Sequence, residues 1–264
     1  NTHMASHEKS DTRLRIVNGF MSVFHGILFM TVIIVGDPYL NLTTFDAIAR
    51  LNNDTLIDSF LIPSGVPTLH GDLYFTWFVA SFFLLSCVFH MGNSILWHKS
   101  YLANLHDARA PYRWLEYFFS ASVMLTSIAY LAGMVFIIQL FYVFCLTATT
   151  MIFGHLTEVI NRPSKEGDKW ELSPLKRLEP HIYGWVPQVS VWIGVVYTFM
   201  GGSNGWEDGQ GPPDFVTYIV ISELFLFMIF AFVQIAVLLR PPSKYIQGEY
   251  AYQLLSLLSK GFLG

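Results

Sequence analysis

The sequence predicts an all-α membrane protein, a bundle of seven transmembrane helices. Of its 264 residues, 53% are hydrophobic and only 13% are charged, whereas about a quarter of the residues of soluble domains are charged. The mean hydropathy of +0.45 leaves too little polar surface to face water. The apolar residues also form runs of about 20, the length that crosses a hydrocarbon core about 30 Å thick. The predicted spans are 15–36, 73–97, 111–134, 137–159, 181–201, 214–239 and 248–264.

The rest of the chain is interpreted as termini and connections. Residues 1–6 read like a cloning remnant, so 7–264 are expected to form a single membrane domain. The loop 37–72 is too long for a simple connector, and its alternating stretch 55–62 favours a short β-hairpin. A net charge of −4 gives no excess of positive charge of the kind that binds nucleic acid. The only cysteines, Cys87 and Cys145, lie in apolar runs, so they are expected to be buried free thiols.

The distribution of lysine and arginine predicts the orientation. Thirteen of the 15 lie before or at the start of the first span, or between or at the borders of spans two and three, four and five, and six and seven. Arg50 lies on the opposite side, and Lys260 lies inside the last span. Because cytoplasmic loops carry the excess of positive charge, the amino terminus is expected in the cytoplasm and the carboxyl terminus outside the cell.

Lys260 is the most informative ionisable residue. It lies 12 residues into the seventh span, about 18 Å from the cytoplasmic start at 1.5 Å per residue, and so near the midplane. A snorkelling lysine would lie near a helix end. At this depth the amine must lose its proton, pair with an acid or be covalently modified.

Glu116, in the cytoplasmic half of the third span, is the expected partner of Lys260. Helical side chains lean toward the amino terminus of their helix, which points Lys260 toward the cytoplasmic half. An alternative is that Glu116 lies at the interface and pairs with Arg113, three residues earlier.

Hydroxyl groups occupy the other positions around this pair. Ser120 and Ser127 share the face of Glu116, and Ser256 precedes Lys260 by four residues. In light-driven proton pumps, the positions held here by Ser127 and Ser256 typically carry carboxylates. One lysine and one glutamate with hydroxyl neighbours are therefore expected.

Further ionisable residues lie within the spans. His25 and His90 are either bonded core histidines or, with Glu116, the lining of a small hydrated cavity that holds a released proton. His155 and Glu158 are expected at the inner interface. Glu223 lies about nine residues from the outer end of its span, where a charge would cost a few kcal/mol.

These residues resemble those of the heliorhodopsins, retinal proteins with inverted topology, over all seven spans. The third-span and seventh-span motifs are the specific ones. The matching segments are Val23-Phe24-His25, Phe89-His90, Arg113-Trp114-Leu115-Glu116-Tyr117, Ser122-Val123-Met124, Gly248-Glu249-Tyr250-Ala251-Tyr252 and Leu255-Ser256-Leu257 with Lys260.

The resemblance implies all-trans retinal bound covalently to Lys260 as a protonated Schiff base, with Glu116 as its counterion and His25 and His90 in the adjoining cavity. Ser256 and Ser120 are the expected hydroxyl neighbours. It also implies a homodimer, and the long first outer loop is expected to help join the two copies. The implied chromophore slot is lined by Tyr117, Met124, Met151, Trp192, Phe227 and Phe230.

Two positions depart from the family pattern. His155 stands where a large apolar residue is expected, and Glu223 introduces an acid where the family is usually apolar. The function predicted is light sensing without ion pumping or enzymatic activity, signalling to an unidentified partner. The first alternative is a light-gated proton channel that uses Glu223. A haem-binding membrane oxidoreductase with His25, His90 and His155 as ligands is a further alternative, although these histidines are not paired along the helices.

Overall fold

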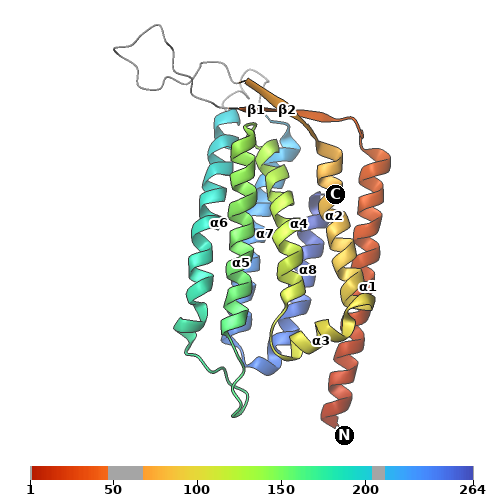
Figure 1. Ribbon diagram of the computed structural model, residues 1–264, viewed down its shortest axis with the longest axis vertical. Coiled ribbons are helices and arrows are strands. Elements are labelled where there is room, and N and C mark those ends of the chain that lie inside the picture. Colours follow the sequence, from red (N-terminus) through yellow and green to blue (C-terminus); the bar gives the residue numbers. More distant parts are fainter. Residues whose placement is uncertain (1, 47–67, 204–211, 264) are drawn as a thin grey trace.

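Seven long helices form the bundle seen in Figure 1, a computed structural model that describes residues 2–46, 68–203 and 212–263. They coincide with the seven predicted spans, and most of their ends fall within three residues of the predicted ones. The helices are α1 (Thr2–Val35), α2 (Phe75–Met91), α4 (Pro111–Leu131), α5 (Ile137–Ile160), α6 (Pro174–Ser203), α7 (Asp214–Leu239) and α8 (Tyr245–Leu263).

Four segments among the described residues are long and apolar enough to cross a membrane: Ser10–Val35, Phe75–Leu96, Ile137–Ile160 and Asp214–Leu239. Membrane crossing by α4, α6 and α8 stays a prediction. The outer surface of the bundle is apolar, and Phe20, Ile193 and Phe225 are 59%, 65% and 64% exposed. So many exposed apolar side chains suit lipid as the surrounding solvent.

The expected hairpin is present in the connection between α1 and α2. Strands β1 (Asn41–Asp46) and β2 (Thr68–Tyr74) pair antiparallel, with an irregularity in register between Thr44 and Phe45. The stretch 55–62, from which the hairpin was predicted, lies outside the described residues. The Phe45 amide donates to the Val135 carbonyl at 3.0 Å, which holds the hairpin against the turn between α4 and α5.

Short helical elements lie at the end of the bundle opposite the hairpin (Figure 1). A π-helical segment, η1 (Gly92–Leu96), continues α2 and is followed by α3 (His98–His106), while the 3₁₀ turn η3 (Pro242–Lys244) joins α7 to α8. The Trp97 ring lies so close to Gly92 that a Cβ atom there would be 1.8 Å from it. The start of α1 and the connection from α5 to α6 lie at the same end, which therefore carries most of the lysines and arginines.

Candidate functional site

Lys260 and Glu116 form a buried ion pair in the centre of the bundle. Lys260, on α8, is 2% exposed, and its Nζ lies 2.6 Å from Oε1 of Glu116 on α4. The lysine also donates a hydrogen bond to Ser86 on α2 and lies 5.3 Å from the centre of the Tyr117 ring. Two opposite charges taken out of water together stabilise each other where either alone would be costly. The geometry is that of the predicted pair.

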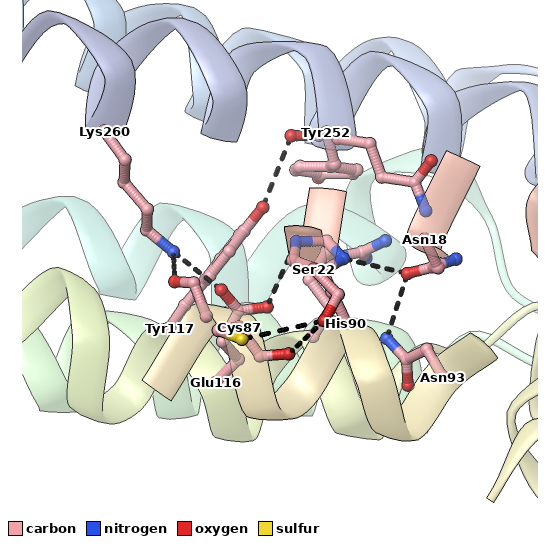
Figure 2. A network of polar contacts seen from close by, with 12 residues as sticks. Asn18, Ser22, Cys87, His90, Asn93, Glu116, Tyr117, Tyr252 and Lys260 are labelled. Carbon is pink, nitrogen blue, oxygen red and sulfur yellow. Dashed lines mark hydrogen bonds and ion pairs between the residues drawn. The ribbon is translucent and has the colours of Figure 1, made fainter. Parts of the chain in front are cut away.

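Two histidines continue this pair toward α1. His90 places Nε2 4.0 Å from the second carboxylate oxygen of Glu116, and its Nδ1 lies 2.9 Å from Oδ1 of Asn18. The same Asn18 oxygen accepts a hydrogen bond from Asn93 at 3.5 Å (Figure 2). The ring of His25 stacks on that of His90 at 5.5 Å, and neither of its nitrogens has a hydrogen-bond partner in the described structure. The polar cluster therefore has unused hydrogen-bonding capacity beside Glu116.

A second buried cluster lies nearer the cation-rich end. Arg113 is 4% exposed and bonds Glu158 on α5 and Glu249 on α8. The Tyr101 hydroxyl donates to Glu249 at 3.0 Å and accepts from Asn18 at 3.4 Å, which connects this cluster to His90.

This second cluster bears on two expectations. Glu158, expected at the inner interface, lies two residues before the end of α5, where its side chain is 2% exposed and also accepts a hydrogen bond from the Ala110 amide at 2.9 Å. Arg113 is bonded to Glu158 and Glu249, so the alternative pairing of Glu116 with Arg113 is not the one formed.

A cavity of about 820 Å³, including its open mouth, adjoins Lys260. Ligand pockets are mostly apolar with a few placed polar groups, as this one is. Seven of the predicted chromophore-site residues line it: Tyr117, Met124, Met151, Phe227, Phe230, Ser256 and Lys260. The cavity and the ion pair therefore meet at Lys260.

Other predicted residues lie just outside the cavity lining. Trp192 packs against Phe227, with ring centres 5.6 Å apart. Ser120 is fully buried, and its hydroxyl has no partner in the described part of the chain. Glu116 is a member of the ion pair, His90 on α2 lies 4.0 Å from its carboxylate, and His25 on α1 stacks on His90.

The comparison with known families agrees with this geometry. The heliorhodopsin family model matches residues 14–264. The chain belongs to the heliorhodopsin family. No curated protein matches it significantly. Heliorhodopsins are retinal proteins, so membership supports retinal as the ligand class of the cavity beside Lys260.

Glu223, the acid expected to depart from the heliorhodopsin pattern, faces the inside of the bundle. It is fully buried on α7, and neither carboxylate oxygen has a partner among the described residues by strict hydrogen-bond geometry. Its polar neighbour is Ser259, the residue before Lys260. An acid without a cation in this position is costly to ionise.

The sequence interpretation missed several residues of this heliorhodopsin site. Ser86, Asn18 and Glu249 were not singled out as polar partners, although Glu249 stands in a recognised motif. The available signal was the cost of burying charge: Arg113 and Glu249 both lie in predicted spans, where each needs a partner. Ser86 and Asn18 gave no such signal, because single hydroxyl and amide side chains are common in membrane helices.

Proposed function

We propose that this protein is a light-sensing retinal protein, with the chromophore linked to Lys260 and Glu116 as its counterion. The observation that carries the proposal is the buried Lys260–Glu116 pair at the edge of a mostly apolar cavity. Retinal, when bound, would supply absorption of visible light and a change of shape on isomerisation. Family membership favours it over the haem alternative.

The residues around the pair define what the protein itself would do. Glu116 stabilises positive charge at Nζ, and Ser86 accepts a hydrogen bond from the same atom. A proton that leaves Nζ can stay within the cluster of Glu116 and His90, since His90 Nε2 has no other partner in the described structure. The connection through Asn18 and Tyr101 to Glu249 extends toward the cation-rich end.

The orientation proposed is an amino terminus in the cytoplasm and a carboxyl terminus outside the cell membrane. The cation-rich end would then face the cytoplasm, as the distribution of positive charge requires. A long-lived change in the polar network at that end would be available to a signalling partner, whose identity the site does not specify.

The test of the chromophore assignment is a visible spectrum of the apoprotein after addition of all-trans retinal. A broad band is expected that bleaches with hydroxylamine under illumination. Lys260→Ala should abolish the band, because the other lysines among the described residues lie toward the ends of helices or in connections. Lys244→Ala, in the η3 turn that precedes α8, is the control and should keep it. An unchanged spectrum in Lys260→Ala would refute the assignment.

A second candidate function, a light-gated proton conductance, is favoured by the burial of Glu223 beside Ser259. Pumping itself is disfavoured, because Ser127 occupies the donor position and its hydroxyl bonds the Val123 carbonyl at 3.0 Å. A channel needs only a continuous path, and Glu223 would extend the polar residues outward from Lys260.

Voltage-clamped cells expressing the protein distinguish the two functions. The sensor predicts no steady photocurrent. A light-evoked current that reverses with the proton gradient and disappears in Glu223→Gln would establish the channel. The membrane potential contributes about 2.3 kcal/mol per charge per 100 mV, enough to drive such a current.

A further inference from the structure

The cavity beside Lys260 has a second polar region on its α6 side. Helix α6 packs against α5 and α7, whereas α8, which carries Lys260, packs against α7 and α1. The residues that line the cavity belong to α4, α5, α6, α7 and α8, so the cavity extends from α8 to α6. On α6, His181, Gly184, Trp185 and Gln188 line it, which places them on one helical face.

Most of the polar groups in this region are already bonded to each other. His181 Nδ1 lies 2.8 Å from Oε1 of Gln234, and the Gln234 amide nitrogen donates to the Gly154 carbonyl at 2.9 Å. Trp185 donates its indole N–H to His181 Nε2 at 3.1 Å. These side chains consequently have little hydrogen-bonding capacity left for a ligand.

Gln188 is the exception. It is 8% exposed, it lines the cavity, and neither its amide oxygen nor its amide nitrogen has a hydrogen-bond partner in the described part of the chain. A buried amide without partners costs about 1–3 kcal/mol, so such groups are normally satisfied. Leucine would fill similar space without this cost. The group that satisfies Gln188 must therefore come from the contents of the cavity.

We infer that Gln188 binds an oxygen substituent on the ring end of the chromophore, so that this protein prefers a ring-hydroxylated retinal to unsubstituted retinal. The inference rests on the proposed attachment at Lys260, because a chromophore fixed at α8 would direct its ring toward α6. A hydroxyl can donate to the Gln188 oxygen and accept from its nitrogen, so one substituent suits both free atoms. Unsubstituted retinal has no polar group at that end.

The test is a competition for the apoprotein between all-trans retinal and all-trans 3-hydroxyretinal, with 4-hydroxyretinal in a parallel arm. The chromophore is extracted and quantified, and quenching of tryptophan fluorescence gives an independent affinity. At least one hydroxylated form is expected to bind about fivefold or more tightly than unsubstituted retinal. This ratio of affinities is what one net buried hydrogen bond contributes. Gln188→Leu should remove the preference while leaving binding of unsubstituted retinal intact or stronger.

The control variant is Gln139→Leu, the same change at an exposed position of α5, which should keep the preference. Equal binding of all three retinals would overturn the inference, and it is the result expected if a water molecule satisfies the Gln188 amide. A preference that persists in Gln188→Leu would also overturn the inference. These results leave the proposed function standing if unsubstituted retinal still gives a band that depends on Lys260. Failure of every retinal to give that band would instead refute the proposed function.

Discussion

Burial of Lys260 makes Glu116 electrostatically necessary. The lysine is 2% exposed, and Glu116 is the carboxylate that it contacts, while Ser86 supplies a neutral acceptor. Removing one member of a buried ion pair is strongly destabilising, because it leaves the other charge without compensation. The spectral effect of Glu116 should therefore be large compared with that of any surrounding hydroxyl group.

Glu116→Gln is expected to move the absorption band of the retinal-loaded protein to longer wavelength in its protonated form, or to replace it with a near-ultraviolet band if the proton is lost. The carboxylate stabilises positive charge at Nζ. Without it, the charge either spreads along the chromophore, which shifts absorption to longer wavelength, or is lost with the proton, which gives the near-ultraviolet band. Spectra recorded at fixed pH would measure the change.

Glu223→Gln is the matched control, because it removes a buried carboxyl that forms no ion pair among the described residues. It should shift the band much less than Glu116→Gln. A large shift in the control together with no response at Glu116 would mean that Glu223 supplies the counterion.

At the residue scale, depth and helical spacing were enough to predict the Lys260–Glu116 pair. They did not predict the partner of Glu158, which was expected at the inner interface because it lies near a helix end. The guanidinium of Arg113 holds Glu158 in the core, and that contact joins residues 45 positions apart. Contacts of this range depend on how helices are arranged around one another, which hydropathy does not report.

At the element scale, hydropathy predicted the long helices well because each contains a mostly apolar stretch of about 17 or more residues. It missed α3, which has nine residues, several of them polar, and therefore no span-length signal. It also started α6 at 181, whereas the helix begins at Pro174. The first turns of α6 are polar and extend beyond the apolar run, and proline suits a first helical position.

An exposed aspartate in the connection between α5 and α6 bonds the turn between α7 and α8, beside the hydrogen bond that Trp170 donates to the Arg240 carbonyl at 2.7 Å. Asp168 accepts hydrogen bonds from the Ser243 hydroxyl and from the Ser243 amide, the latter at 2.9 Å. These bonds hold the pKa of Asp168 below its ordinary value of 3.8. Because the pKa is lowered in the folded state, the stabilisation is present above about pH 4 and is lost as the pH falls through the folded pKa.

Asp168→Ala is accordingly expected to lower the melting temperature at neutral pH, and the difference from the parent protein should shrink as the pH falls below about 4. Melting curves of detergent-solubilised protein across this range would measure it. Glu166→Ala, in the same exposed connection, is the control and should change little. A difference that is independent of pH would show that Asp168 acts through something other than its charge.

For the whole molecule, polar residues are distributed unevenly along the bundle. From Lys260 a series of polar side chains leads through Glu116, His90 and Asn18 to Tyr101 and the Arg113 cluster, toward the cation-rich end, with a 4.0 Å separation between Glu116 and His90. In the opposite direction from Lys260, Ser259 is the next polar residue, and the ionisable side chain of Glu223 lies beside it. This asymmetry suits a proton that leaves and returns on one side.

The hairpin end offers a surface for self-association. Strand β1 is held on one edge by β2 and contacts Phe136 through Phe45, whereas β2 pairs only with β1 among the described residues. Leu69 on β2 is 66% exposed. An unpaired strand edge with exposed apolar side chains is a template for pairing with another chain.

We therefore expect a symmetric dimer, as family resemblance implies, with β2 contributing to the contact between copies. In a twofold-symmetric dimer both protomers contribute the same strand edge to the contact. A single substitution is therefore present on both sides of the interface. Leu69→Glu should reduce the dimer fraction measured by crosslinking in membranes, because it brings two like charges together at the contact.

Glu166→Lys, at the opposite end of the bundle, should leave that fraction unchanged. Crosslinking that detects only monomers of the parent protein in membranes would refute the dimer, whereas a dimer unaffected by Leu69→Glu would place the contact on the helices instead.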